Sequence, residues 1–196
     1  MDAVHSTHAH GHSISTEQHN YMLKFGWWLY IASEVMLFSS LIAVFLLAKK
    51  LYPEESHHLE VGPTTISTFV LLTSSWFMVR ALASLHEGNI VALQRGLFLT
   101  LILGATFVGF QAYEYTHLSH AGVTLHSTMY GSAFYALTGF HGAHVIIGLI
   151  WVAWAFIKAM NGHFTKEKYI GIEVLGLYWH FVDVVWILLF TLIYLV

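Results

Sequence analysis

The sequence predicts an all-α integral membrane protein, a bundle of five transmembrane helices. Of its 196 residues, 57% are hydrophobic and only 10% are charged. A soluble domain has about 25% charged residues, so this chain has too few to cover a surface exposed to water. The apolar residues also fall into five long runs, each close to the roughly 20 residues that a helix needs to cross a membrane.

The five runs are bounded by polar or charged residues. The first ends at Lys49 and Lys50, and the second begins just after Pro63. Because the prolines lie in the first loop, no span is expected to have a proline kink. Thr165 is predicted to cap the fifth helix, with Glu167 in its first turn, where the helix dipole favours an anion. The predicted spans are residues 25–48, 64–85, 97–115, 130–157 and 171–196.

Residues 1–23 are predicted to form a polar, His-rich cytoplasmic tail, and residues 24–196 one five-helix domain. The tail has no basic region followed by an apolar core, so we do not expect a signal peptide. The spacing of its histidines is irregular, which favours a plain tail over a metal site.

The basic residues predict the orientation, because cytoplasmic loops carry an excess of Lys and Arg. Only Lys49 and Lys50 lie on one side of the predicted bundle. We therefore expect the N-terminus to be cytoplasmic and the C-terminus to face outward. The basic residues on the other side are Lys24, Arg80, Arg95, Lys158, Lys166 and Lys168.

Composition also excludes several classes of function. The chain has no cysteine, which excludes disulfides, thiolate metal sites and a cysteine nucleophile. Its net charge of −3 gives no electrostatic case for a nucleic-acid partner. The sequence contains no phosphate-binding glycine loop, serine-nucleophile elbow or HExxH motif, so no catalytic residue is predicted.

Four carboxyl groups lie within the predicted spans: Glu34, Glu114, Glu173 and Asp183. Glu173, at the start of the fifth span, is expected to stay solvated or to pair with a nearby basic residue. Glu34 comes ten residues after Lys24, about 15 Å along a helix, and so near mid-membrane. It could relay protons or contact lipid headgroups, or it could be a protonated carboxyl bonded to a neighbouring helix; the sequence leaves both open. Glu114 lies toward the end of the third span, where a structural role near headgroups is expected.

Imidazoles lie in the fourth and fifth spans. His141 and His144 are spaced i, i+3, as are His180 and Asp183, so each pair shares a helix face. The two pairs could converge on a metal or a haem. Alternatively, they form a polar network, with Glu114, between closely packed helices. Predicted packing residues are Gly139, Gly142, Ala143, Gly148, Trp179 and Trp186.

Five segments, among them His163-Phe164-Thr165, together resemble subunit III of the haem–copper oxidases. Residues 130–148 are similar to its signature helix and residues 178–186 to its last helix. Residues 33–38, Ser-Glu-Val-Met-Leu-Phe, resemble its buried-glutamate helix, and residues 111–115, Gln-Ala-Tyr-Glu-Tyr, also fit. The matches occur in order over nearly the whole chain.

The resemblance implies a non-catalytic subunit of a terminal oxidase that reduces O₂ to water with proton pumping. Haem and copper then lie in partner subunits, so His141, His144, His180 and Asp183 are implied to be structural. The implied role is to stabilise subunit I and support its proton uptake and turnover. Implied partners are subunit I, subunit II, a small subunit IV and membrane lipid. Glu34 matches the family's buried glutamate of the lipid and proton-entry region.

Five helices match the shorter bacterial form of this family, which implies a location in the bacterial plasma membrane. The form lacks the two helices that make one wall of the family's lipid cleft, so bound phospholipid depends on what fills that space. Gly139-Phe140-His141-Gly142 favours the cytochrome c oxidase branch; a quinol oxidase is the alternative. From other classes, a standalone membrane haem protein and a small transporter remain, although no internal repeat supports a transporter.

Overall fold

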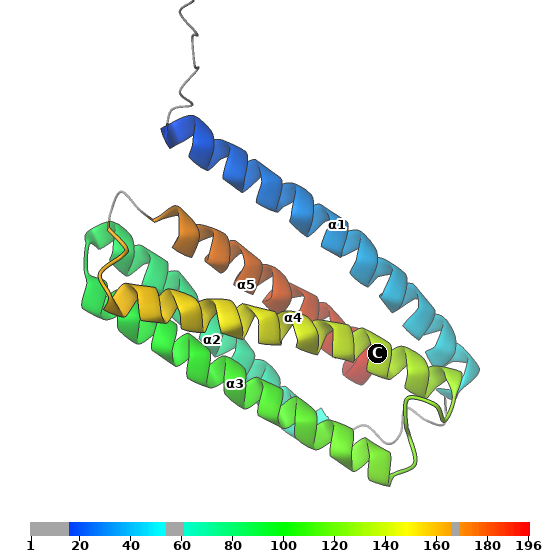
Figure 1. Ribbon diagram of the computed structural model, residues 1–196. Coiled ribbons are helices and arrows are strands. Elements are labelled where there is room, and N and C mark those ends of the chain that lie inside the picture. Colours follow the sequence, from blue (N-terminus) through cyan, green and yellow to red (C-terminus); the bar gives the residue numbers. More distant parts are fainter. Residues whose placement is uncertain (1–15, 54–60, 166–168) are drawn as a thin grey trace, which may run out of the picture.

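The computed structural model describes residues 16–53, 61–165 and 169–196, and within these ranges the chain is almost entirely helical. All five long helices are long and apolar enough to cross a membrane, which confirms the predicted fold class. Figure 1 shows them in order: α1 (Thr16–Leu51), α2 (Val61–Glu87), α3 (Ile90–His120), α4 (Met129–Met160) and α5 (Ile170–Phe190), followed by the π-helical turn η2 (Thr191–Leu195).

Helices α1 to α4 are longer than the predicted spans because they continue past the apolar runs, whereas α5 ends at Phe190 and η2 takes up the rest of its predicted span. Between α2 and α3, Gly88 adopts a φ of 81°, and the Asn89 side chain accepts a hydrogen bond from the Ala92 N–H at 3.0 Å. The Thr128 hydroxyl caps α4 by accepting from the Gly131 N–H at 3.1 Å. Such side-chain acceptors satisfy the free N–H groups of a first turn.

The predicted tail and the predicted cap of the fifth helix also differ from the structure. Residues 16–23, assigned to the tail, belong to α1, while residues 1–15 lie outside the described ranges. Thr165 does not cap α5, because that helix begins at Ile170 and Tyr169 precedes it without a side-chain cap. Glu167 lies outside the described residues, and Glu173 is the acid found in the first turn.

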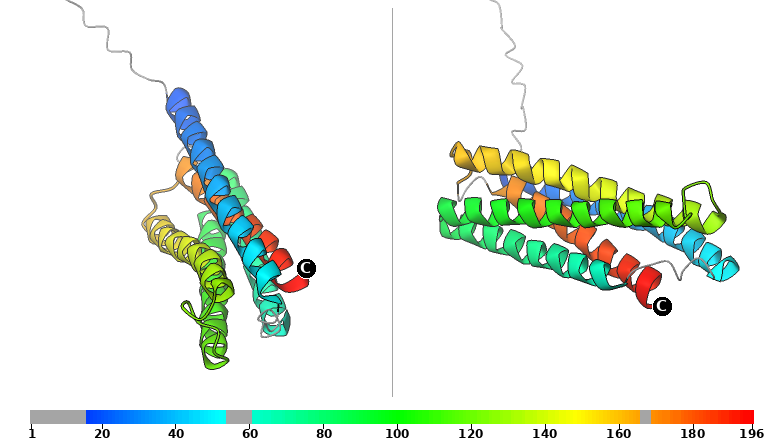
Figure 2. Two further views of the ribbon diagram at one scale, coloured as in Figure 1. Left: turned by 90° about the vertical axis from the view of Figure 1, so that its right-hand side faces the viewer. Right: turned by 90° about the horizontal axis from the view of Figure 1, so that it is seen from below.

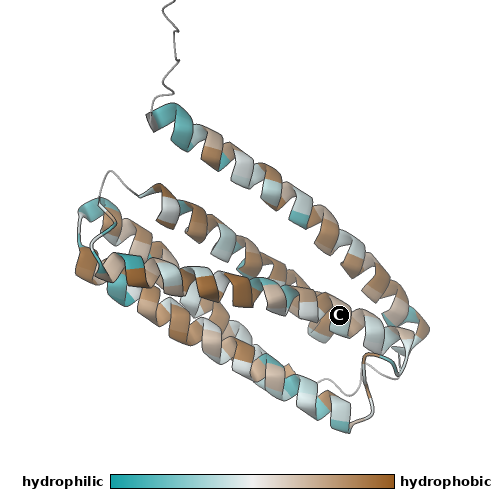
Figure 3. Ribbon diagram, in the orientation of Figure 1, coloured by the Kyte–Doolittle hydropathy of each residue, from teal (hydrophilic) through white to brown (hydrophobic). Residues whose placement is uncertain are grey.

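The helices form a bundle in which α5 is central and α1 is peripheral (Figures 1 and 2). Helix α2 packs along α3, α3 along α4, and α5 against both α2 and α4. Helix α1 packs on α4 and α5. In the apolar window of α5, 61% of residues are buried, against 17% in that of α1. Figure 3 shows the hydrophobic colouring along the helices and hydrophilic positions gathered at several of their ends.

Trp179 and Trp186 of α5 fill the centre of the bundle. Each is 1% exposed, and each indole N–H donates to α2, at 3.1 Å to the Ser74 hydroxyl and at 2.9 Å to that of Thr68. Buried indoles need such acceptors. The α2 hydroxyl groups therefore fix the orientation of the two rings.

The small residues on α4 differ in how closely a neighbouring helix approaches them. A Cβ on Gly148 would lie 2.9 Å from the Trp179 ring, and one on Gly142 would lie 2.9 Å from Gln111 Oε1 on α3. Gly139 is looser, with its nearest neighbour 3.8 Å away. Ala143 is exposed, because it lies one residue, or about 100° around the helix, from Gly142. Gly148 is thus the position where α4 and α5 approach closely.

Candidate functional site

Glu34 and His144 form a pair between α1 and α4. Glu34 Oε2 lies 3.2 Å from His144 Nε2, and the two side chains are 15% and 12% exposed. One turn along α1, the Phe38 ring packs edge-on against the imidazole, with centroids 5.3 Å apart. The pair is therefore largely closed off from the surroundings by its own helices.

The facing atoms of the pair are in contact, but Glu34 Oε2 has no hydrogen-bond partner among the described residues. His144 Nδ1 lies 2.7 Å from the Phe140 carbonyl oxygen, and a carbonyl can only accept, so Nδ1 carries a hydrogen. Nε2 and the Glu34 carboxyl oxygen therefore lie within ion-pair distance of each other without a hydrogen bond between them.

Aromatic residues surround this pair. The Tyr178 hydroxyl on α5 donates to the His144 carbonyl at 2.9 Å, and the Tyr30 side chain on α1 interacts with Glu34. Trp27 of α1 packs against Trp151, with ring centroids 5.1 Å apart. The site therefore lies where α1, α4 and α5 meet.

The remaining predicted polar residues lie in separate contacts. His141 is fully buried, stacked on Trp186 and edge-on to Phe107, and neither ring nitrogen has a hydrogen-bond partner among the described residues. His180 Nδ1 lies 2.6 Å from the Ser75 hydroxyl on α2, and the Asp183 side chain also interacts with Ser75.

The polar contacts of these residues thus go to α1 and α2, and one polar network does not join α4 to α5 among the described residues. Spacing of i, i+3 places residues on one face but does not say which helix that face meets. Within the described ranges, no three His, Asp or Glu side chains gather in a way that could hold a metal ion.

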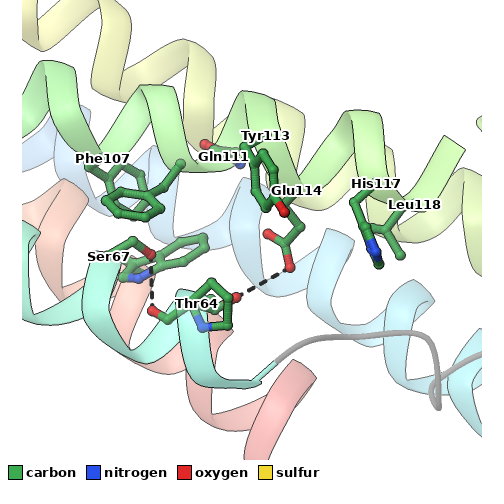
Figure 4. A pocket seen from close by; sticks show the side chains of 11 residues that line it. Thr64, Ser67, Phe107, Gln111, Tyr113, Glu114, His117 and Leu118 are labelled. Atoms are coloured by element: carbon green, nitrogen blue, oxygen red, sulfur yellow. Dashed lines mark hydrogen bonds between the residues drawn. The ribbon is translucent and has the colours of Figure 1, made fainter. Parts of the chain in front are cut away.

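Glu114 lies in a pocket at the C-terminal end of α3. Its Oε1 accepts from the Tyr194 hydroxyl at 2.6 Å and from the Thr64 hydroxyl at 3.3 Å, and so connects α3 with η2 and α2. Figure 4 shows the carboxylate facing Thr64 across the pocket. The pocket is lined by Pro63, Thr64, Ser67, Phe107, Phe110, Gln111, Tyr113, Glu114, His117, Leu118 and Trp186.

Polar contacts tie both ends of α1 to the C-terminal part of the chain: a basic partner for Glu173 was one of two expectations, whereas the partners of Lys49 were not predicted. Lys24 Nζ lies 2.7 Å from Glu173 Oε1 on α5. At its other end, Lys49 Nζ donates to the carbonyl groups of Leu192 and Ile193, each at 3.1 Å. We name these two regions the Lys24 end and the Lys49 end of the bundle. The basic residues were visible in the sequence, but their partners on α5 and η2 are more than 140 residues away.

Comparison with known proteins gives one family. The family model for cytochrome c oxidase subunit III matches residues 2–196. A probable cytochrome c oxidase subunit 3 of Nocardia farcinica is 39% identical over 179 residues, 89% of this chain and 88% of that protein.

Two proteins of Bacillus subtilis are similar to the same degree. Its cytochrome c oxidase subunit 3 is 40% identical, covering 87% of this chain and 84% of the relative. Its quinol oxidase subunit 3 is 37% identical, covering 87% and 85%.

The five membrane-spanning helices and the match over nearly the whole sequence agree with each other. This family supplies the non-catalytic subunit of haem–copper oxidases, without redox cofactors of its own. The chain belongs to the cytochrome c oxidase subunit III family and is a multi-pass membrane subunit of a haem–copper terminal oxidase.

Proposed function

We propose that this chain supports proton uptake by the catalytic subunit I of a bacterial oxidase, and that the Glu34–His144 pair carries this role. The pair brings two ionisable side chains into contact inside a membrane-spanning bundle. A buried ionisable group inside a membrane is a candidate for proton transfer or for lipid contact. The supporting observation is the 3.2 Å contact between Glu34 Oε2 and His144 Nε2.

Glu34→Gln tests this proposal, because glutamine keeps the size and an acceptor but cannot take up a proton. In the purified oxidase we expect activity to be lost several-fold faster during turnover, and proton uptake to slow. Glu173→Gln is the matched control, since it removes a carboxylate from the Lys24 end and leaves Glu34 intact. If Glu34→Gln leaves turnover stability, lipid content and proton uptake unchanged, the proposal is wrong.

The partners follow from the family. We infer that subunit I is the main contact, with subunit II and a small subunit IV nearby, in a plasma membrane. The chain should co-purify with a large subunit that contains haem and copper. After this chain is stripped off, the haem should stay with that subunit; a Soret band on the stripped chain would identify it as a haem protein instead.

The electron donor is proposed to be cytochrome c. Relatives named for both donors are similar to this chain, and Gly139-Phe140-His141-Gly142 favours cytochrome c. Oxidation of reduced cytochrome c by the purified complex supports this choice. Oxidation of a quinol without cytochrome c would identify the quinol branch.

The orientation is also a proposal, with the N-terminus in the cytoplasm. It rests on six basic residues on that side against Lys49 and Lys50 on the other. A reporter that is active only outside the cytoplasm should work when fused after Val196 and should be inactive when fused in the loop after Met160. The reverse pattern would invert the assignment.

A further inference from the structure

Helices α2 and α5 pack against each other and present a common outward face. Ser75 on α2 is in contact with His180 on α5, which aligns the two helices. Leu72 and Val79 lie one turn before and one turn after Ser75, and Val184 lies one turn after His180. These apolar side chains are exposed, as are Trp76 and Ile187 beside them. We name the following set the α2–α5 face: Leu72, Trp76, Val79, His180, Val184 and Ile187.

The α2–α5 face lies at the middle of the membrane-spanning segments. Trp76 is two residues from the centre of α2, about 3 Å along the axis. His180 is two to three residues from the centre of the span Ile170–Leu195, about 4 Å. Because Ser75 touches His180, both centres lie at the same depth. Polar groups on this face are therefore far from the water on either side of the membrane.

His180 directs one ring nitrogen outward at this depth. Ser75 Oγ lies 2.6 Å from Nδ1, which fixes the orientation of the ring. Nε2 lies on the other edge of the ring, where it has no hydrogen-bond partner among the described residues and is not enclosed by them. Both ring nitrogens of His141, in contrast, are enclosed. A histidine nitrogen is either a donor or an acceptor, so Nε2 of His180 needs a partner from outside this chain.

Trp76 adds a second polar group to the face. Its side chain is 59% exposed, and its indole N–H has no acceptor among the described residues. The buried indoles of Trp179 and Trp186 both donate to hydroxyl groups of α2. Tryptophan that faces lipid is favoured near the membrane interfaces, where its N–H finds water or headgroups. At mid-membrane, the N–H of Trp76 requires an acceptor from a partner.

Exposed hydroxyl groups elsewhere in the spans do not need a partner. Ser39, Thr73 and Thr106 each donate to a carbonyl group four residues earlier in their own helix, at 2.7, 2.8 and 2.9 Å. Such residues can face hydrocarbon. Acyl chains offer no hydrogen-bonding group, so they satisfy neither Trp76 nor His180. This difference distinguishes the α2–α5 face from a surface that only lipid covers.

We propose that the α2–α5 face packs against a transmembrane helix of another subunit of the oxidase, and that this helix presents an oxygen-bearing side chain at mid-membrane. The oxygen accepts from the Trp76 N–H and contacts His180 Nε2. A hydroxyl group fits both positions, because it accepts from the indole and either donates to or accepts from the imidazole. The oxygen belongs to a side chain, since the backbone carbonyl groups of a spanning helix are taken up by its own hydrogen bonds. This inference rests on the chain being an oxidase subunit and is independent of Glu34 and of the electron donor.

Spin labels test whether protein or lipid covers the face. The chain has no cysteine, so Val184→Cys gives one labelling site in this subunit, and the complex without that substitution gives the background from other subunits. The labelled oxidase in lipid discs is compared with a lipid that carries a nitroxide near the bilayer centre. We expect collisions with oxygen to be several-fold rarer at Val184→Cys; a thiol that reacts only after the complex is denatured gives the same answer. Equal collision rates would show that lipid covers the face and would overturn the proposal.

Trp76→Phe tests the polar contact by itself. It keeps an aromatic ring and leaves the contact between Ser75 and His180 intact, so the fold of this subunit should be unchanged. We expect this subunit to dissociate from the purified oxidase about threefold faster in detergent, the effect of one interhelical hydrogen bond of average strength. Trp154→Phe makes the same change at a 50% exposed position on α4 and is the matched control, which should leave the rate unchanged. An unchanged rate for Trp76→Phe, or an equal increase for the two variants, would contradict the proposal.

A density map of the whole oxidase identifies the occupant of the face. It should show a side-chain oxygen of another subunit within hydrogen-bond distance of Trp76 Nε1 or His180 Nε2. Acyl chains or a second copy of this chain against the face would refute the assignment. A helix of another subunit with only apolar side chains at that depth would refute it as well.

Discussion

Lys24 Nζ on α1 lies 2.7 Å from Glu173 Oε1 on α5, at the same end of two helices that are far apart in the sequence. Together with Lys49 at the other end and Glu34 between them, this contact ties a mostly exposed helix to the rest of the bundle. Helix α1 is thus attached through a few polar contacts and a narrow apolar stripe.

The Lys24–Glu173 ion pair should contribute little to stability. Its side chains are 34% and 25% exposed, so water and salt screen the attraction. A double-mutant cycle with Lys24→Met and Glu173→Gln should give a coupling of less than about 1 kcal/mol. Thermal unfolding of the purified subunit at low and high salt measures it, and the coupling should shrink with salt. A larger, salt-independent coupling would mean that the pair is better shielded than its exposure indicates.

Lys49 should matter more than its neighbour Lys50. Lys49→Met removes two charge-assisted hydrogen bonds to the carbonyl groups of Leu192 and Ile193. We expect a loss of about 1.5–3 kcal/mol and faster hydrogen exchange over residues 191–196. Lys50→Met, at an exposed position, is the control and should change neither quantity. Equal effects of the two variants would argue against the contact.

Two glycines on α3 should respond in opposite ways to alanine. A Cβ on Gly104 would lie 2.8 Å from the buried ring of Trp179, whereas one on Gly109 meets nothing within 4 Å. Gly104→Ala should therefore destabilise the bundle by about 1–3 kcal/mol through overpacking. Gly109→Ala should be neutral or stabilising by up to about 1 kcal/mol, because alanine favours the helix. Thermal unfolding of both variants checks the contrast, which equal shifts would contradict.

His141 and His144 should also differ, although they share a helix face. His141 is buried between aromatic rings without a hydrogen-bond partner among the described residues, so His141→Phe should be neutral or stabilising. His144→Phe leaves Glu34 without its imidazole, and we expect a loss of several kcal/mol, about 3–5 for a broken buried pair. The unfolding midpoints of the two variants decide. A strongly destabilised His141→Phe would show that this imidazole has a polar role.

The helices could be predicted from the sequence because hydrophobic length is a local property. The ends of the helices could be predicted less well, since caps such as Asn89 and Thr128 lie outside the apolar runs. The polar residues of the site were identified, but their partners were not. The contact of His144 with Glu34, and of His180 with Ser75, depends on how helices are arranged around one another, and no local spacing encodes that.

Pocket residues were the least predictable. Glu114 was expected near the headgroups in a structural role, and it does bond to Thr64 and Tyr194. Its aromatic surroundings come from α3 and α5, which are brought together only by the bundle. The contact of Tyr194 with Glu114 could not be predicted from the sequence, because an aromatic residue near the end of a span is expected at a membrane interface in any case.

The attachment of α1 to α4 and α5 has a consequence for synthesis. Helices α2 and α3 are joined by a short turn and can pair as soon as both have entered the membrane. The first helix is made long before Glu173, its partner 149 residues later. At about 5–20 residues per second, the ribosome takes roughly 7–30 seconds to cover that distance. Helix α4 arrives first, since His144 follows Glu34 by 110 residues, and until then α1 resides in the bilayer with lipid or an insertion factor against the side where α4 and α5 will pack.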